Sequence, residues 1–225
     1  MVDPGLTRHD VMVFGAAGAL GAGVAAAFAD MGAAVVGADR VKPAVERRLA
    51  GVSYETLDVL DDAAVSALLS ARSAPWAVIN TIGGFAPRRP LAELDVVELN
   101  AQLQLNLVSA AIITKNALRV MLPAGSGRIL HTASHAGVDS TGAGFPYAVS
   151  KLGVLRLVEM AASEVRGTGI TVNCVVPHII DTPANRAAMP AADHESWPKV
   201  HEIARSYVYL ASPDSSLVNG AAIPV

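Results

Sequence analysis

Short apolar runs alternate with longer helical stretches along the whole of this 225-residue chain. The apolar runs occupy residues 11–14, 34–38, 54–57, 77–80, 128–132, 170–176 and 221–225. A nearly continuous apolar run such as 170–176 is typical of a strand that is buried on both faces of a parallel sheet. Because strands that alternate with helices form βαβ units, the sequence predicts an α/β fold in one domain, with a doubly wound parallel sheet of about seven strands ordered 3-2-1-4-5-6-7.

Helical periodicity fills the intervals between these runs. The expected helices are residues 19–31, 41–50, 61–70, 95–121, 147–165 and 200–211, of which 41–50 is short, charged and exposed. Pro123 and the glycines that follow it are expected to end the long helix 95–121. Residues 177–198 are expected to form a loop punctuated by proline.

The composition excludes several classes of protein. Hydrophobic residues make up 52% of the chain and charged residues 16%, which excludes a mainly disordered chain. The formal net charge of −3 leaves no excess of basic side chains for the phosphates of a nucleic acid, so no nucleic-acid partner is expected. Cys174 is the only cysteine, and no Cys/His cluster has metal-ligand spacing, so we expect a cytoplasmic protein without a metal site.

Residues 11–29 contain no charged side chain and are long enough to suggest a membrane span or a signal peptide. Gly15, Gly18, Gly21 and Gly23 would weaken an isolated helix in this segment. Acidic residues flank the segment on both sides, whereas a signal peptide begins with basic ones. We therefore expect no membrane association.

The turn between the first strand and the first helix has the sequence GAAGALG, with Gly15, Gly18 and Gly21. A dinucleotide site needs glycines where the backbone turns off the strand, approaches the pyrophosphate and packs the helix on the sheet. The spacing departs from G-x-G-x-x-G, and glycine-rich turns also serve packing alone. The turn indicates a dinucleotide site if other residues support it.

Asp39 ends the second strand, 18 residues after Gly21. A carboxylate at this position can accept hydrogen bonds from the adenosine ribose and would repel a 2′-phosphate. The neighbouring Arg40 could instead bind that phosphate. The sequence therefore favours NAD(H) as the cofactor, with NADP(H) as the alternative.

Tyr147 and Lys151 lie four residues apart in YAVSK, so on a helix their side chains share one face. A phenol is a poor acid-base catalyst at pH 7, but a lysine cation about 4 Å away would favour the phenolate by at most about 4 kcal/mol and lower its pKa by up to about three units. Ser134, at the exit of the fifth strand, could hold a carbonyl oxygen. Such a pair also occurs on helices by chance, but together with the glycine turn it indicates a catalytic site.

These motifs, taken in order, resemble the short-chain dehydrogenase/reductase family over essentially the whole chain. They are GAAGALG, Asp58-Val59 after the third strand, NTIGG at residues 80–84, Asn106 within LQLNLVSAA, Ser134 thirteen residues before Tyr147, the YxxxK pair, and VNCVVPHIIDTP. The resemblance implies one Rossmann-type domain over residues 1–225 that binds NAD(P). It also implies an enzyme that interconverts a secondary alcohol and a ketone, with a small-molecule carbonyl or alcohol as its substrate.

The resemblance implies catalytic roles for four residues. Tyr147 would donate or accept the proton, and Ser134 would orient the substrate oxygen. Lys151 would bind the nicotinamide ribose and tune Tyr147, and Asn106 would hold a water in the proton relay. The expected cofactor-binding residues are Gly15, Gly18, Ala19, Leu20, Gly21, Asp39, Arg40, Asp58, Val59, Asn80, Gly83, Tyr147, Lys151, Pro177, Ile180 and Thr182, of which Ile180 and Thr182 would meet the nicotinamide amide.

Two positions depart from the family pattern. Phe14 stands where threonine is common, with Ala19 in place of the middle glycine, and His178 stands where glycine usually follows Pro177. The stretch 181–197 is similar to the dihydropteridine reductase branch, which reduces quinonoid dihydropterins with NADH but lacks the serine and asparagine found here. A pterin reductase is therefore the alternative function, and a non-catalytic NAD(H)-binding module is a third.

Three histidines, His131, His135 and His178, are expected near the carboxyl ends of the fifth and sixth strands, where the site should lie. His131 is expected to pack within its strand, whereas His135, His178 and Phe85 are expected to contact the substrate. Arg88 and Arg89 follow Phe85 and could attract an anionic substrate, although paired arginines in a loop are usually only solvated.

Helices 95–121 and 147–165 are more apolar than one covered face requires. Resemblance to the family implies that these helices pair across two-fold axes. We therefore expect a homodimer or a homotetramer.

Overall fold

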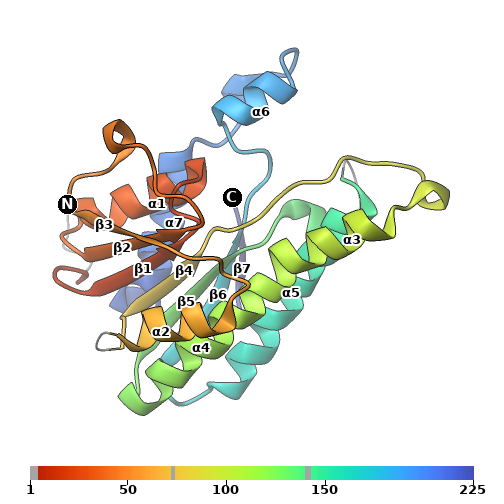
Figure 1. Cartoon of the computed structure of the whole chain (residues 1–225). Coiled ribbons are helices and arrows are strands. Elements are labelled where there is room, and N and C mark those ends of the chain that lie inside the picture. Colours follow the sequence, from red (N-terminus) through yellow and green to blue (C-terminus); the bar gives the residue numbers. More distant parts are fainter. Residues whose placement is uncertain (1–4, 72–73, 140–142) are drawn as a thin grey trace.

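A computed structural model of the chain describes residues 5–71, 74–139 and 143–225. One sheet of seven parallel strands runs through the centre of the molecule (Figure 1). The strands are β1 (Asp10–Phe14), β2 (Ala34–Asp39), β3 (Val52–Thr56), β4 (Ala77–Asn80), β5 (Gly127–Thr132), β6 (Ile170–Val176) and β7 (Ala222–Pro224). Their order is β3-β2-β1-β4-β5-β6-β7, and every adjacent pair is parallel. The structure confirms the expected α/β fold, the single Rossmann-type domain and the strand order.

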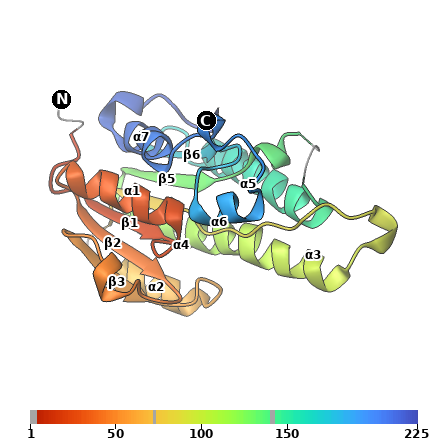
Figure 2. The same cartoon turned by 90° about the horizontal axis from the view of Figure 1, so that it is seen from above.

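Helices cover both faces of the sheet (Figure 2). They are α1 (Ala19–Asp30), α2 (Asp62–Ser70), α3 (Val96–Gln102), α4 (Ser109–Ala124), α5 (Phe145–Glu164), α6 (Pro183–Ala188) and α7 (Val200–Ala211). On one face α1 and α7 pack together and bury Phe28, Ile203 and Tyr207 against the sheet. On the other face α2, α4 and α5 form a second core that includes Ile113 and Val158.

The strand order places a crevice between β1 and β4. From β1 the chain continues through α1 to β2 on one side, and from β4 it continues through α4 to β5 on the other side. Ligands of open α/β sheets bind at the carboxyl ends of the strands where the order reverses in this way. The glycine turn follows β1 and Asn80 ends β4 at this point, so the fold puts the candidate site there.

Three expected elements differ from the structure. Residues 41–50 form no α-helix but only a short 3-10 turn at Val45–Arg47. Pro43 lacks an amide proton and disfavours a helical conformation at the residue before it. Val41 and Val45 remain 70% and 72% exposed, so no apolar face holds the segment on the core.

The expected helix 95–121 is interrupted in the structure, and the helical stretch extends to Ala124. A π-helical segment, Leu103–Val108, separates α3 from α4. Pro123 lies inside α4, which continues for one residue beyond it, so the proline does not itself end the helix. The helix ends at Gly125, whose φ of +66° is the left-handed conformation of a C-cap glycine.

The expected loop 177–198 contains α6 and a 3-10 turn at His194–Ser196. Thr182 caps α6 by accepting a hydrogen bond from the amide of Asn185 at 3.2 Å, and Pro183 occupies the first helical position. Thr-Pro is a recognised helix start, and it was a signal that the sequence reading overlooked.

One helical stretch of the described residues, Val96–Ala124, is long and apolar enough to cross a membrane by length and composition alone. Its residues Ala110, Ile113, Ala117 and Met121 are buried in the core beneath the sheet. A core helix of a globular fold passes the same test. The uncharged segment 11–29, by contrast, is divided between β1 and α1.

Candidate active site

The glycine turn joins β1 to α1 and closes tightly. Gly15 has a φ of +86°, which glycine adopts without strain, and its carbonyl oxygen accepts a hydrogen bond from the Gly18 amide at 3.1 Å. A Cβ atom on Gly21 would overlap the Gly15 carbonyl oxygen, so only glycine fits there. Ala19 and Leu20 begin α1, and Gly18, at the N-cap, has no side chain to accept from the first amides. The turn therefore offers those amides to an anionic ligand, as a pyrophosphate site requires.

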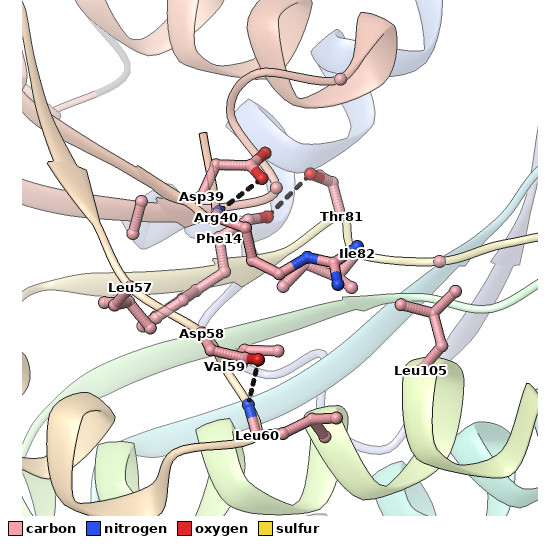
Figure 3. A pocket seen from close by; sticks show the side chains of 14 residues that line it. Phe14, Asp39, Arg40, Leu57, Asp58, Val59, Leu60, Thr81, Ile82 and Leu105 are labelled. Atoms are coloured by element: carbon pink, nitrogen blue, oxygen red, sulfur yellow. Dashed lines mark hydrogen bonds between the residues drawn. The ribbon is translucent and has the colours of Figure 1, made fainter. Parts of the chain in front are cut away.

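A cavity of about 230 Å³ opens beside this turn (Figure 3). Seven expected cofactor-binding residues line it, namely Gly15, Gly18, Asp39, Arg40, Asp58, Val59 and Gly83. The sequence reading missed the others, which are Phe14, Ala38, Leu57, Leu60, Thr81, Ile82 and Leu105. Most of the missed residues are apolar side chains next to a recognised motif, and they give the cavity walls suited to a flat aromatic ring.

Among the missed residues, Thr81 links two strand ends at the cavity. Its hydroxyl donates to the Phe14 carbonyl oxygen at 2.8 Å, which ties the end of β4 to the end of β1. Phe14 itself is 1% exposed and packs in the core. The threonine that the family commonly has at position 14 is therefore not needed for a polar contact at this point of the turn, because Thr81 supplies one from the neighbouring strand.

Asp39 faces the glycine turn from the end of β2. One carboxylate oxygen accepts from the Ala17 amide at 3.0 Å and the other from the Arg40 amide at 2.7 Å. These two bonds fix the carboxylate at the rim of the cavity, where Arg40 also lies (Figure 3). Asp58 is fixed similarly on the opposite wall, where it accepts from the Leu60 amide at 2.9 Å.

Asn80 is buried at the end of β4 and does not line the cavity. Its side-chain oxygen accepts from the Ile82 amide at 3.0 Å, and its side-chain nitrogen contacts His131 Nδ1 at 3.3 Å. His131 Nε2 lies 2.8 Å from the hydroxyl of Thr114, which donates to the Ala110 carbonyl oxygen. These bonds are all satisfied when His131 is neutral with its proton on Nε2, and burial lowers its pKa to about 4. His131 is thus packed within its strand, as expected, and holds Asn80 in place.

Ser134, Tyr147 and Lys151 meet at the carboxyl end of β5. The Ser134 hydroxyl is hydrogen-bonded to the Tyr147 hydroxyl. Lys151, on the next turn of α5, is 3% exposed and donates from Nζ to the Thr132 carbonyl oxygen at 2.9 Å. Its Nζ lies 6.0 Å from the centre of the Tyr147 ring.

The ionisation of this pair differs from the expectation. Burial raises the pKa of Tyr147, and the hydrogen bond from Ser134 opposes that rise only in part. Burial also lowers the pKa of Lys151 to about 8. The expected lowering of the Tyr147 pKa by Lys151 was therefore wrong for the protein alone, because the ammonium group is directed to Thr132 and the desolvation of the phenol dominates.

Asn106 lies in the π-helical segment and is 1% exposed. Its side-chain nitrogen donates to Ser150 Oγ at 3.0 Å and to Gln102 Oε1 at 2.8 Å, and its oxygen accepts from the Gly84 amide at 3.0 Å. Ser150 in turn donates to the Tyr147 carbonyl oxygen at 2.7 Å. Asn106 therefore joins the loop after β4 to the first turns of α5.

Gly83 connects the cavity with these polar residues. It lines the cavity, and a Cβ atom placed on it would lie 2.9 Å from Lys151 Nζ and 3.0 Å from Asn106 Oδ1. Residues from β1, β2, β4, β5, α5 and the π-helical segment thus form one continuous site along the carboxyl edge of the sheet.

Of the residues expected to contact substrate, Phe85 lies beside Tyr147, and His135 and His178 follow the ends of β5 and β6. The Phe85 ring lies 5.3 Å from the Tyr147 ring, edge to face, and is 64% exposed. The rings of His135 and His178 stack with their centres 3.7 Å apart. Arg88 and Arg89 are exposed in the loop after Phe85.

The residues expected near the nicotinamide follow β6. Pro177 is buried, and its carbonyl oxygen accepts from the His135 amide at 3.1 Å. The Ile180 carbonyl oxygen accepts from Asn185 Nδ2 at 2.8 Å, and Thr182 caps α6. None of these three residues lines the cavity beside the glycine turn.

The amino-acid sequence is similar to those of known oxidoreductases. A family model described as enoyl-(acyl carrier protein) reductase matches residues 15–225. The chain is 34% identical to the cis-4-hydroxycyclohexanecarboxylate dehydrogenase of Sinomonas cyclohexanicum, over 95% of this chain and 93% of that one.

The fold is similar to those of solved dehydrogenase structures. A Burkholderia xenovorans protein described as a short-chain dehydrogenase/reductase superposes with a TM-score of 0.87 at 27% identity, over 98% of this chain and 95% of that one. A Beutenbergia cavernae protein described as an NAD(P)-dependent gluconate 5-dehydrogenase, with NADP bound at low occupancy, gives a TM-score of 0.90 at 25% identity, over 99% and 96% of the two chains.

Proposed function

The chain belongs to the short-chain dehydrogenase/reductase family and is an NAD(P)-dependent oxidoreductase, and we propose that it interconverts a secondary alcohol and a ketone with NAD(H). The main support for the proposal is that Ser134, Tyr147, Lys151 and Asn106 lie close together at the carboxyl edge of the sheet. Gly83 contacts this cluster and also lines the cavity at the glycine turn. This arrangement supports acid-base chemistry next to a bound dinucleotide.

Each polar residue has a separate task in the proposed reaction. The nicotinamide ring would supply or accept the hydride. Tyr147, whose raised pKa keeps it protonated at neutral pH, gives its proton to the ketone oxygen or takes one from the alcohol. Ser134, hydrogen-bonded to Tyr147, directs the substrate oxygen toward that phenol.

Lys151 and Asn106 support these two residues. The Lys151 ammonium lies beside Gly83, where it can bind a ribose hydroxyl and stabilise the phenolate as it forms. Asn106 fixes the loop after β4 against α5, and it can hold a water molecule that passes the proton onward.

The substrate that we propose is a compact cyclic alcohol or ketone. The Phe85 ring lies against Tyr147, and the stacked rings of His135 and His178 follow the ends of β5 and β6; flat side chains of this kind suit a ring-shaped substrate. The relative from Sinomonas cyclohexanicum acts, by its name, on a hydroxycyclohexanecarboxylate. The stretch 181–197 keeps the pterin alternative open, but Ser134 and Asn106 favour a carbonyl.

A screen of NADH oxidation tests the proposed reaction. The panel holds cyclohexanone, 4-oxocyclohexanecarboxylate, linear ketones, β-ketoacyl thioesters, quinones and quinonoid dihydropterin. We expect turnover of the cyclic ketones and oxidation of the matching alcohols by NAD. Turnover of the dihydropterin alone would show that the pterin reductase alternative is correct.

Replacing Asp39 by alanine is expected to reduce the preference for NADH over NADPH by about tenfold, because a carboxylate at ribose distance repels a 2′-phosphate by about 1–2 kcal/mol. Direct titration of cofactor fluorescence measures both dissociation constants. Asp58→Ala is the matched control. Asp58 lines the same cavity, and the family resemblance implies that Asp58 and Val59 flank the adenine, which both cofactors share, so its loss should weaken both cofactors alike. Tighter binding of NADPH than NADH by the unaltered protein would contradict the proposed preference and show that Arg40 dominates.

We also propose that the protein assembles as a homodimer or homotetramer through α4 and α5. Leu122 on α4 and Leu152 and Met160 on α5 are 48%, 49% and 58% exposed, which is costly for large apolar side chains in water. Sedimentation at micromolar concentration is expected to show two or more chains per particle. A monomer at that concentration would contradict this prediction.

A further inference from the structure

The segment between Asp181 and Lys199 leaves the sheet and returns to the same point. The Asp181 amide donates to the Pro198 carbonyl oxygen at 3.0 Å, and Asp181 and Lys199 form an isolated parallel bridge. In Figure 1 α6, which belongs to this segment, stands above the strand ends and away from both helical layers. We call residues 181–199 the cap.

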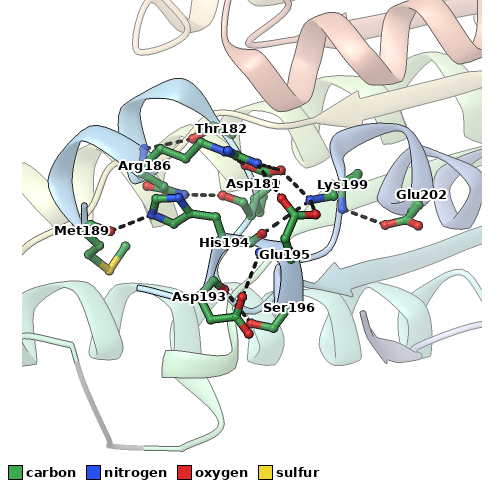
Figure 4. A network of polar contacts seen from close by, with 12 residues as sticks. Asp181, Thr182, Arg186, Met189, Asp193, His194, Glu195, Ser196, Lys199 and Glu202 are labelled. Atoms are coloured by element: carbon green, nitrogen blue, oxygen red, sulfur yellow. Dashed lines mark hydrogen bonds and ion pairs between the residues drawn. The ribbon is translucent and has the colours of Figure 1, made fainter. Parts of the chain in front are cut away.

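One carboxylate closes the base of the cap (Figure 4). Asp181 accepts from Arg186 Nε at 2.5 Å and Nη2 at 2.8 Å, which is the two-pronged pairing that arginine makes with a carboxylate. It also accepts from Lys199 Nζ at 2.8 Å. Glu195 lies 3.8 Å from Arg186 and 3.7 Å from Lys199, on the outer side of the cluster.

Burial separates the two acidic residues. The Asp181 side chain is 11% exposed, whereas that of Glu195 is 84% exposed. Exposed ion pairs contribute little to stability, because water and salt screen them. The ion pairs of Glu195 are therefore expected to contribute little to holding the cap together. The two cations, Arg186 first, hold the pKa of Asp181 well below its usual range, so its charge persists at any pH near neutrality.

The inside of the cap has its own contacts. His194 Nε2 lies 2.8 Å from the Met189 carbonyl oxygen, and the His194 ring packs on Trp197, which is 8% exposed. Asn185 donates to the carbonyl oxygen of Ile180, the residue just before the cap, at 2.8 Å. The cap is therefore held mainly by contacts among its own residues, and the Asp181 cluster joins its two ends.

One end of the cap adjoins the expected nicotinamide residues, and the other end packs on helix α1. Ile180 and Thr182, expected at the nicotinamide, flank Asp181 directly. Val200 follows Lys199 and packs so closely on α1 that a Cβ atom on Gly23 would overlap it. Loss of the Asp181 contacts is therefore expected to displace the nicotinamide side of the site. The glycine turn should stay in place, because β1 and Thr81 hold it independently.

We infer that Asp181 is a positioning residue, which holds the cap assembled before any ligand binds and so fixes Ile180 and Thr182 for the nicotinamide half of the cofactor. This inference rests on the proposed binding of NAD(H) for its second part only. Its first part concerns the protein alone.

Trypsin digestion without ligand tests the first part. Cleavage after Arg186 requires the arginine side chain to leave Asp181, so it reports opening of the cap. We expect Asp181→Asn, which keeps the size of the side chain but offers donors where Arg186 and Lys199 donate, to raise cleavage after Arg186 about tenfold. Glu195→Gln should leave it unchanged, and cleavage after the exposed Arg166 is the internal reference.

Cofactor binding tests the second part. If the cap of Asp181→Asn is assembled about a fifth of the time, the dissociation constant of NADH rises about fivefold. That of ADP-ribose, which lacks the nicotinamide, should stay unchanged. Lys199→Gln, which removes one donor from the same carboxylate, provides both measurements should Asp181→Asn fail to fold.

Three results separate the possible failures. Equal cleavage after Arg186 in the unaltered protein and in Asp181→Asn would overturn the assembled cap. Equal weakening of NADH and ADP-ribose would overturn the positioning role and leave Asp181 a purely structural residue. Failure of the unaltered protein to bind either ligand would refute the proposed function, while the digestion would still decide whether Asp181 closes the cap.

Discussion

Replacing Tyr147 by phenylalanine is expected to lower kcat by about a hundredfold to ten-thousandfold, the usual contribution of a positioned general acid or base. Phenylalanine keeps the ring and its edge-to-face contact with Phe85, so only the hydroxyl is lost. The ring oxygen is the group that exchanges a proton with the substrate in the proposed reaction. Because Tyr147 is also an expected cofactor-binding residue, cofactor affinity is expected to fall as well, but much less than kcat, and steady-state kinetics with a cyclic ketone and NADH separate the two effects.

Tyr209→Phe is the matched control for this substitution. Tyr209 lies on α7 and is 51% exposed, so the same chemical change there should leave kcat unaltered. Ketone reduction that survives Tyr147→Phe unchanged would contradict the proposed mechanism, even though the family assignment would stand.

The pH dependence of the reaction follows from the buried phenol. Burial raises the pKa of Tyr147 in the protein alone, so the residue carries its proton at neutral pH and is ready to give it to a ketone. Alcohol oxidation needs the opposite protonation state, so we expect its rate to rise with pH while the rate of reduction falls. The Lys151 ammonium stabilises the phenolate only if it faces the phenol, and in the protein alone it is bonded to Thr132.

The sheet could be predicted from the sequence because its strands are simple to recognise. β4 and β6 are buried along their whole length, and such strands need continuous apolar runs. The place of Asp39 at the cavity could also be predicted, since it ends β2 directly after an apolar run, whereas Asn80 ends β4 but is buried away from the cavity. The carboxyl edge of a parallel sheet brings such residues together without any further information.

Other parts depend on contacts that no local pattern shows. In the π-helical segment the Asn106 side chain bonds to Gly84, Ser150 and Gln102 at once, and two of these partners are distant in sequence. The neutral state of His131 depends on its burial in the folded core, and the position of its proton depends on Thr114, which lies on another element. The direction of Lys151 Nζ depends on the free carbonyl oxygen of Thr132, and spacing within YAVSK predicts only the shared helix face.

Lys151→Met is expected to lower turnover by about a hundredfold or more, yet to leave the free energy of unfolding at pH 7 within about 2 kcal/mol of the unaltered protein. Lys151 is 3% exposed, and the drop of its pKa from 10.5 to about 8 means that burying its charge costs about 3 kcal/mol at neutral pH. Methionine removes that cost and fills a similar volume. It also leaves the Thr132 carbonyl oxygen without its donor, which costs about 1–3 kcal/mol and offsets most of the gain.

The difference in stability between the two proteins is expected to depend on pH in a known direction. Between pH 8 and 10.5 the unfolded chain keeps the Lys151 proton while the folded protein has lost it, so the unaltered protein gains about 3 kcal/mol over the variant across that interval. The other titrating groups are shared by the two proteins. Burial lowers the pKa of His131 to about 4 and raises that of Cys174 to about 12, and Lys151 lowers both pKa values by a smaller amount. In the folded protein these two groups therefore titrate outside the interval from pH 7 to pH 10. Urea unfolding of both proteins at pH 7 and pH 10 measures the change. A difference that stays constant with pH would contradict a buried ammonium group at this position, and the source of the electrostatic support for Tyr147 would then have to be sought in another residue.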